Sequence, residues 1–309
     1  MKVLITSNSF GTYDNSPRQQ MTDLGWELIE NRYKHIMNEE EMMEEVKGID
    51  AIILGSDTVS KKVLEQADRL QIISRYGVGI DNIDLEEAKR RNIAVTVTKN
   101  SNSAAVADYT LGLMLATLRH ICSVNSNLKQ GVWKKETGLD LCDKVVGVFG
   151  LGSIGKEVVQ RLKGFGCTIL GYDAFIDETY CKEHNITMLT PEEIFAKADV
   201  ITLHMPGMAN GASFIGEKEL QLMKPTTVII NTARASLIDE EAIIKACTKR
   251  QIYGYGTDVF ANEPEMNEAF RTLGNVVVSP HTAAVSVEAV NKMSSLAVQN
   301  LIDFFERKE

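Results

Sequence analysis

The sequence predicts an α/β protein of two domains, each a doubly wound parallel sheet covered by helices. Short apolar runs alternate with helical patterns over most of the 309 residues, and this alternation is typical of parallel sheets. Continuous apolar runs such as Val145–Phe149 suit a sheet buried on both faces. The chain is also longer than a single domain usually is, so two domains are the default expectation.

Ten apolar runs are expected to form strands. They are Val3–Thr6, Ala51–Leu54, Ile72–Ser74, Ala94–Val97, Val145–Phe149, Thr168–Tyr172, Val200–Leu203, Thr227–Ile230, Tyr253–Thr257 and Val276–Ser279. Amphipathic segments lie between many of them, for example Ser60–Ala67, Leu85–Arg90 and Lys156–Lys163. Because their apolar residues recur at helical spacing, we expect these segments to be the covering helices.

The alternation is interrupted once, between Asn102 and about Lys129, where the pattern is helical throughout. A long helix there would carry the chain from one domain into the next. The C-terminal stretch Val287–Glu309 is helical again and is expected to return to the first domain.

These crossings define the expected domains. One comprises residues 1–98 plus 286–309, and the other comprises residues 99–285. The segments Lys99–Ser103 and Ala284–Val287 are therefore candidate hinges.

Composition argues against several classes of protein. The net charge is −9 and the pI is about 5.2, so a nucleic-acid partner is not expected. The N-terminus lacks the features of a signal peptide, and no apolar run approaches the roughly 20 residues that span a bilayer. We therefore expect a cytoplasmic protein with no membrane partner. The cysteines form no CxxC pair, so neither a disulfide framework nor a metal site is expected. They are Cys122, Cys142, Cys167, Cys181 and Cys247.

A glycine-rich turn connects the predicted strand Val145–Phe149 to a helical pattern. The turn reads Gly150-Leu151-Gly152-Ser153-Ile154-Gly155. Gly150 permits the tight turn, Gly152 lets the backbone approach a pyrophosphate, and Gly155 lets helix and strand pack closely. The helix start at Ser153 and Ile154 offers unpaired N–H groups to phosphates. A glycine turn that binds nothing is the alternative, and the complete strand–turn–helix context favours a dinucleotide site.

Asp173 follows the next strand, Thr168–Tyr172. A carboxylate at this position accepts hydrogen bonds from the adenosine ribose hydroxyls and repels a 2′-phosphate. No arginine occupies the next three positions, Ala174 to Ile176. The sequence therefore predicts NAD rather than NADP, against the alternative that Asp173 is only a solvated acid at a strand end.

An arginine, a glutamate and a histidine follow three predicted strands of the second domain. Arg234 comes after Thr227–Ile230, Glu263 after Tyr253–Thr257, and His281 after Val276–Ser279. In open parallel sheets, ligands bind at the carboxyl ends of the strands, so we expect these side chains to converge there. Such a set offers a cation for a carboxylate and a carbonyl, a proton donor, and a group that tunes the donor.

The ordered set of motifs resembles the D-isomer-specific 2-hydroxyacid dehydrogenases, closest to the phosphoglycerate dehydrogenase-like subgroup. The resemblance spans almost the whole chain. It is carried by Ser74–Asn82, Gly150–Gly155 with Asp173, Leu203–Pro206, Met223-Lys224, Asn231–Arg234, Asp239-Glu240, Asp258–Phe260, Glu263-Pro264 and Pro280-His281. It implies a Rossmann NAD-binding domain inserted into a flavodoxin-like substrate domain.

The resemblance implies the reaction and the role of each reacting group. The enzyme would interconvert a small 2-keto acid and its D-2-hydroxy acid by hydride transfer with NAD. Arg234 would bind the substrate carboxylate and carbonyl, and His281 would be the acid/base at the C2 oxygen. Glu263 would pair with His281, orient it and favour its charged form.

The resemblance also implies binding residues in both domains. Backbone N–H groups of Val78 and Gly79, in the loop with Tyr76 and Gly77, would bind the carboxylate, and closure would bring this loop against Arg234. Arg75 is the candidate ligand for a second anionic group. The cofactor contacts would come from Gly150, Gly152, Ser153, Ile154, Gly155, Asp173, His204, Pro206, Thr232, Ala233, Asp258 and His281. Asp258 would bind the nicotinamide carboxamide, whereas His204 is expected mainly to shape the loop over the cofactor.

The sequence departs from the family pattern in three places. Ala235 replaces the usual glycine after the arginine, and Thr282-Ala283-Ala284 follows His281 where a glycine often stands. At the end of the second predicted strand, Leu54–Asp57 lacks the arginine that meets the phosphate in phosphoglycerate dehydrogenases. A 3-phosphoglycerate substrate, or another dianionic hydroxy acid, therefore depends on Arg75. A C-terminal regulatory domain is not expected.

Three alternatives remain. An NAD(H)-sensing binding protein, like the transcriptional corepressors related to this family, would bind cofactor with little turnover. A formate-type dehydrogenase usually pairs its histidine with glutamine, so Glu263 argues against it. A dehydrogenase for larger keto acids depends on loops such as Ser7–Tyr13 and Leu54–Val59.

The segment His120–Leu141, with Trp133, resembles the family's dimer arm, and we expect a homodimer.

Overall fold

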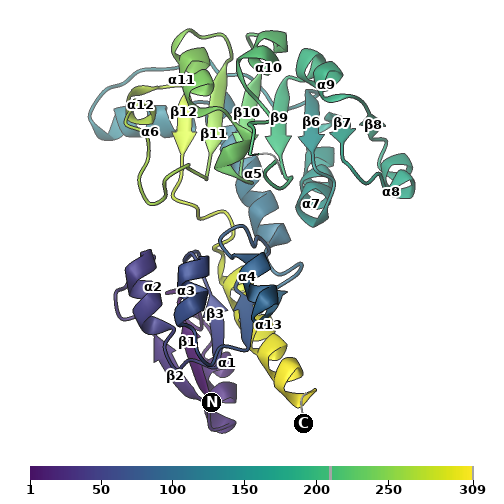
Figure 1. The fold of residues 1–309 in the computed structure, drawn as a ribbon. Helices are drawn as coiled ribbons and strands as arrows, with labels where there is room; N and C mark the ends of the chain where they lie inside the picture. Colours follow the sequence, from purple (N-terminus) through teal and green to yellow (C-terminus); the bar gives the residue numbers. More distant parts are fainter. Residues whose placement is uncertain (209–210, 308–309) are drawn as a thin grey trace. The chain divides into compact units, whose positions relative to one another are not determined.

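The computed structural model describes residues 1–208 and 211–307, and the chain divides into two compact units (Figure 1). Unit 1 comprises Met1–Asn102 and Val285–Glu309, and unit 2 comprises Ser103–Ala284. The division falls after Asn102 and Ala284, where the sequence suggested residues 98 and 285.

Unit 1 contains a five-stranded parallel sheet in the order β2-β1-β3-β4-β5. The strands are β1 (Lys2–Ile5), β2 (Glu27–Glu30), β3 (Ala51–Leu54), β4 (Ile72–Arg75) and β5 (Ala94–Val97). This order is that of the flavodoxin-like fold. The central strand β3 is fully buried because helices cover both of its faces.

The helices of unit 1 form two groups. They are α1 (Ser16–Asp23), α2 (Glu39–Glu45), α3 (Lys61–Gln66), α4 (Leu85–Arg90) and α13 (Val287–Glu306). The helices α2, α3 and α4 bury apolar residues in one core cluster with the sheet. The helices α1 and α13 pack against each other, and α13 lies along β3, β4 and β5. Helix starts are capped locally, as where the Ser60 hydroxyl accepts a hydrogen bond from the N–H of Val63.

Unit 2 contains a seven-stranded parallel sheet in the order β12-β11-β10-β9-β6-β7-β8. The strands are β6 (Val145–Phe149), β7 (Thr168–Tyr172), β8 (Thr187–Met188), β9 (Val200–Leu203), β10 (Val228–Asn231), β11 (Gly254–Thr257) and β12 (Val276–Val278). Counted from β6, the order is the Rossmann order 3-2-1-4-5-6 with one further strand. The predicted fold class is confirmed in both units.

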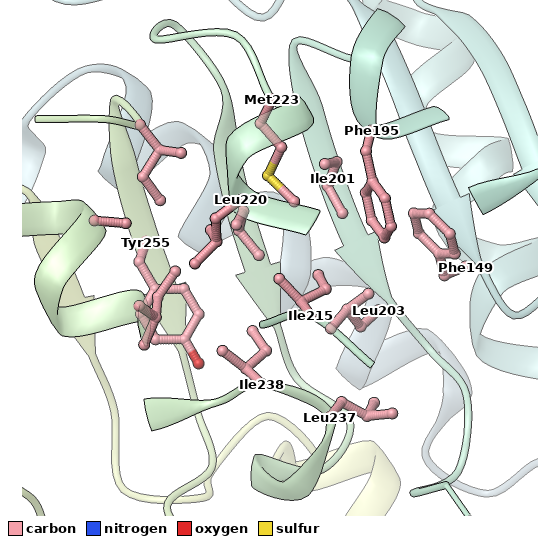
Figure 2. Packing of buried hydrophobic residues seen from close by; sticks show 14 of the residues in the cluster. Phe149, Phe195, Ile201, Leu203, Ile215, Leu220, Met223, Leu237, Ile238 and Tyr255 are labelled. Carbon is pink, nitrogen blue, oxygen red and sulfur yellow. The ribbon is translucent and has the colours of Figure 1, made fainter. Parts of the chain in front are cut away.

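Helices cover both faces of this sheet. They are α5 (Ser103–Leu118), α6 (Ile121–Lys129), α7 (Ser153–Leu162), η1 (Lys163–Phe165), α8 (Glu178–Glu183), α9 (Pro191–Lys197), α10 (Glu217–Leu222), η2 (Ala235–Leu237), α11 (Glu240–Thr248) and α12 (Ala269–Thr272). One core cluster contains residues of α9, α10 and α11, and another contains residues of α5 and α7. Figure 2 shows the first cluster, in which Phe149 stacks on Phe195 with ring centroids 5.1 Å apart.

The predicted helical stretch from Asn102 to Lys129 is two helices rather than one. It breaks between α5 and α6 at His120, whose φ of 55° places it in the left-handed region. A left-handed residue cannot continue an α-helix, so the prediction of a single long helix was wrong at this point. The C-terminal helix ends at Glu306, and positions 308 and 309 lie outside the described residues. Among the described residues, no helix combines the length and apolarity needed to cross a bilayer.

Candidate active site

The glycine turn of unit 2 forms the close contacts that its sequence predicts. Gly150 has a φ of 93°, and a Cβ there would lie 2.5 Å from the carbonyl oxygen of His204. A Cβ on Gly155 would lie 1.9 Å from the carbonyl oxygen of Gly150. Gly152, the residue before α7, has no atom within 4 Å of its ideal Cβ position. The turn therefore leaves open space at the start of the helix, with Ser153 and Ile154 in its first turn.

Asp173 lies directly beside this turn. One carboxylate oxygen accepts a hydrogen bond from the N–H of Leu151 at 2.6 Å, and the other accepts one from the N–H of Phe175 at 2.9 Å. The carboxylate thus ties the end of β7 to the glycine turn. A carboxylate oxygen has two lone pairs, so these bonds leave acceptor capacity for ribose hydroxyls.

His204 and Pro206 lie in the loop after β9. The His204 Nε2 is 2.9 Å from the Thr202 hydroxyl, and burial lowers the pKa of His204 to about 3. The ring is therefore neutral. The backbone carbonyl of His204 packs against Gly150. Pro206 is exposed in the same loop. His204 thus contacts the glycine turn through its backbone carbonyl.

Arg234 is held by the turn that follows β10. The Asn231 side chain accepts a hydrogen bond from the N–H of Ala233 at 3.0 Å and donates one to the carbonyl of Arg234 at 2.9 Å. The Arg234 guanidinium donates to the carbonyl of Ala233 at 2.7 Å. Ala235 begins η2 and, within the described residues, is not among those with positive φ. Its methyl group therefore introduces no backbone strain.

Thr232, in the same turn, contacts helix α5. Its hydroxyl lies 3.0 Å from the hydroxyl of Thr110, which is fully buried. Thr110 also donates to the carbonyl of Val106 at 2.7 Å. The sequence did not reveal Thr110, because it lies in an almost continuous apolar stretch and is far from Thr232 along the chain.

Glu263 and His281 form the central pair of the site. The Glu263 carboxylate lies 2.6 Å from the His281 Nδ1, and its other oxygen accepts a hydrogen bond from the N–H of Phe260 at 3.0 Å. Burial alone would raise the pKa of Glu263, but His281, the Phe260 N–H and the charge of Arg234 together lower it. Glu263 is therefore ionised, and Arg234 is near enough to contribute to that ionisation.

Asp258 holds the loop that carries His281. Its buried carboxylate accepts hydrogen bonds from the Ser279 hydroxyl at 2.6 Å, the N–H of Thr282 at 2.9 Å and the N–H of Ala283 at 2.7 Å. His281 itself has a left-handed φ of 49°. The conformation that presents the histidine thus depends on Asp258. Ser279 was not recognised as a site residue, although it ends a predicted strand.

The sheet explains why these groups meet. Strands β10, β11 and β12 are adjacent and parallel, with Asn231 opposite Thr257 and Thr257 opposite Val278. The loops after these strands therefore leave the same edge of the sheet. That edge carries the three residues expected to converge there, Arg234, Glu263 and His281, together with Asp258. Among the described residues, no group of three or more His, Cys, Asp or Glu side chains is arranged to hold a metal ion.

The predicted substrate residues all lie in unit 1, in and after β4, apart from Arg234. Tyr76 is buried, and its hydroxyl donates to the carbonyl of Val290 at 3.1 Å. Any contact of Tyr76 with substrate would therefore come from its backbone. Gly77, with a φ of 140°, begins a turn in which Val78 is 40% exposed and Gly79 follows. Arg75 contacts the carbonyls of this turn.

The family model for the NAD-binding domain of D-isomer specific 2-hydroxyacid dehydrogenases matches residues 111–283. The chain belongs to this family. The matched residues all lie within unit 2, so unit 2 is the NAD-binding domain of this family member. The resemblance noted in the sequence is confirmed.

Individual relatives agree with this membership. A glyoxylate reductase from Pyrococcus furiosus is 38% identical over 275 residues, which cover 86% of this chain and 82% of that protein. A D-3-phosphoglycerate dehydrogenase from Methanocaldococcus jannaschii is 37% identical over 269 residues, which cover 86% of this chain. The match spans only 51% of the phosphoglycerate dehydrogenase, about half its length.

The fold of this family member also matches solved structures. The TT0316 protein from Thermus thermophilus superposes with a TM-score of 0.90 at 30% identity. The match covers 99% of this chain and 97% of that one.

The glycine turn fits a dinucleotide. Gly152 leaves open space at the start of the helix, whereas an added Cβ on Gly150 or Gly155 would collide with the backbone carbonyls that shape the turn.

Proposed function

We propose that the protein is an NAD-dependent D-2-hydroxyacid dehydrogenase that interconverts a small 2-keto acid and its D-2-hydroxy acid. The observation that carries this proposal is the Glu263–His281 pair, 2.6 Å apart, with the charge of Arg234 close enough to lower the pKa of Glu263. An ionised acid, a histidine and an arginine at one sheet edge are the groups that reduction of a 2-keto acid requires.

The residues would divide the work as follows. The bound cofactor supplies the hydride. Arg234 binds the carboxylate and polarises the C2 carbonyl. Because the Nδ1 of His281 faces Glu263, this nitrogen donates its hydrogen to the carboxylate, and Nε2 holds the proton destined for the C2 oxygen. Glu263 orients the ring and favours its protonated form.

The carboxylate-binding role of the Gly77–Gly79 turn is the second part of the proposal. Within unit 1, neither the Val78 nor the Gly79 N–H donates a hydrogen bond in the described residues. Two such N–H groups in one turn attract an anion, which supports the predicted binding of the substrate carboxylate.

We further propose NAD as the cofactor and a homodimer as the assembly. Asp173 lies beside the glycine turn, where a carboxylate disfavours a 2′-phosphate. Four apolar residues from α6 and the following loop are at least 48% exposed, and Trp133 is 82% exposed. They are Ile121, Leu128, Val132 and Trp133. Such a concentration of exposed apolar residues in one segment supports a subunit interface.

The test is turnover of a panel of 2-keto acids with NADH: glyoxylate, pyruvate, hydroxypyruvate, 3-phosphohydroxypyruvate, 3-sulfopyruvate and 2-oxoglutarate. The variant His281→Ala is measured beside the unchanged protein. Turnover that is lost in the variant supports the dehydrogenase. Tight NADH binding with no turnover across the panel would instead favour the sensing protein or a dehydrogenase for larger acids.

A further inference from the structure

The side chain of Arg75 is bound to the backbone of its own loop. Its Nε donates a hydrogen bond to the carbonyl of Gly79 at 2.8 Å, and its Nη1 donates to the carbonyls of Leu54 and Tyr76. One guanidinium thus connects both sides of the Gly77–Gly79 turn to the end of strand β3. The planar, forked guanidinium can make these bonds together, which a lysine ammonium cannot do in the same geometry.

Thr98 holds the turn from the opposite side. Its hydroxyl accepts a hydrogen bond from the N–H of Gly77 at 2.9 Å, and its own N–H donates to the carbonyl of Gly77 at 3.0 Å. A Cβ on Gly77 would lie 3.1 Å from the Nη1 of Arg75. The conformation of Gly77 is therefore fixed between the arginine and the threonine.

These contacts determine which backbone groups of the turn are available to a ligand. The carbonyls of Tyr76, Gly77 and Gly79 are all bound to Arg75 or Thr98. The N–H groups of Val78 and Gly79, which donate to nothing in the described part of unit 1, are held in one conformation. A donor pair fixed in advance binds an anion without the entropic cost of ordering the loop.

In the described part of unit 1, the neighbouring loops provide no obvious site for a second anion. Arg18 donates to the carbonyl of Phe10 at 2.7 Å and pairs with Glu30. Asp57, after β3, is buried and accepts a hydrogen bond from the N–H of Met37 at 2.7 Å. Arg18 and Arg75 both donate hydrogen bonds to backbone carbonyls. The buried carboxylate of Asp57 would repel an incoming anion.

We propose that Arg75 is a positioning residue that holds the Gly77–Gly79 turn for the substrate carboxylate, and that it does not bind a second anionic group. The site then selects singly charged 2-keto acids over those with an additional phosphate. This inference rests on the proposed function and narrows its substrate class. It replaces the expectation that Arg75 meets a second anion.

The experiment compares Arg75→Lys with the unchanged protein on hydroxypyruvate and 3-phosphohydroxypyruvate, which differ only by the phosphate. Lysine keeps the positive charge but loses the forked contacts to Gly79 and Leu54. We expect KM to rise about ten- to one-hundred-fold for both acids, as for loss of a hydrogen bond to a charged group. The KM for NADH should not change. Arg32→Lys, at an exposed arginine of unit 1, is the matched control and should have no effect.

The ratio of the two kcat/KM values is the decisive quantity. For the unchanged protein we expect it to favour hydroxypyruvate by ten-fold or more, and in Arg75→Lys it should stay the same. A second variant, Arg75→Met, removes the charge and should also leave the ratio unchanged. The proposal is overturned if Arg75→Met loses activity on the phosphorylated acid alone, or if the unchanged protein prefers that acid.

A readout without turnover separates this proposal from the proposed function. Amide hydrogen exchange of the segment 76–82 should be faster in Arg75→Lys than in the unchanged protein, with exchange in unit 2 unaffected. If the unchanged protein reduces no acid, the proposed function fails. The exchange measurement still tests whether Arg75 holds the Gly77–Gly79 turn. Equal exchange in the two proteins would contradict a positioning role for Arg75.

Discussion

Replacing Glu263 by glutamine should lower kcat/KM for reduction. The substitution keeps the side-chain volume but removes the negative charge 2.6 Å from the His281 Nδ1. Because the pKa of Glu263 is lowered, its charge is present at every pH above the ordinary carboxyl range and is lost only as the pH falls through that lowered value. Between pH 5 and 9, the unchanged enzyme therefore always has this charge beside the histidine.

The size of the fall follows from the exposure of the pair. A hydrogen bond between charged groups contributes about 1.5–3 kcal/mol when shielded from water, whereas an exposed ion pair contributes about 1 kcal/mol or less. The His281 side chain is 44% exposed and that of Glu263 is 22% exposed, so the pair lies between these limits. Removing the charge should therefore cost about 1–2 kcal/mol of transition-state stabilisation, which corresponds to a five- to thirty-fold fall in kcat/KM.

The sign is fixed by the direction of the reaction. Reduction requires the protonated imidazole, which the carboxylate favours. In Glu263→Gln, kcat/KM for reduction should therefore fall by this factor throughout the range from pH 5 to 9. The assay is the initial rate of NADH oxidation from pH 5 to 9, with the exposed neighbour Glu265→Gln as the control. An unchanged or higher kcat/KM would refute the role assigned to Glu263.

Three other substitutions test the structure around the site. Gly155→Ala places a Cβ 1.9 Å from the carbonyl oxygen of Gly150, so it should abolish NADH binding and destabilise the protein by about 1–3 kcal/mol. Thermal melting and NADH titration measure these effects. The control is Gly164→Ala, where an added Cβ has open space. Asp258→Asn keeps the volume but faces three donors with one acceptor oxygen, so kcat should fall about ten- to one-hundred-fold; an unchanged kcat would argue against loop positioning. Asp173→Ala should reduce the preference for NADH over NADPH by about ten-fold, and steady-state kinetics with both cofactors would expose a wrong assignment if the ratio did not move.

The sequence was most informative where strands are buried on both faces. The runs Ala51–Leu54 and Val145–Phe149 were predicted with the observed bounds, because a strand that is buried on both faces has a continuous apolar pattern. The edge strands β2 and β8 were missed. β2 has glutamate at both ends, and β8 has two residues, so neither has the apolar length that marks a strand.

The reacting groups could be predicted because each follows a recognisable strand. The contacts that position them could not. The buried hydroxyl of Thr110 reaches Thr232 from a helix more than a hundred positions earlier, and nothing in its apolar neighbourhood marks it. The carbonyl contacts of Arg75 likewise depend on backbone positions that only folding brings together.

The proposed reaction is hydride transfer from NADH to C2 of a 2-keto acid with protonation by His281. It is tested most directly with NADH deuterated at the nicotinamide C4, supplied in turn in each of its two C4 configurations together with the best acid of the panel. We expect one configuration to place deuterium at C2 of a D-hydroxy acid, as seen by NMR and chiral chromatography, and His281→Ala to form almost none of this product. Three results would contradict this reaction: NADH binds but no labelled product forms, the product is an L-hydroxy acid, or His281→Ala forms as much product as the unchanged protein.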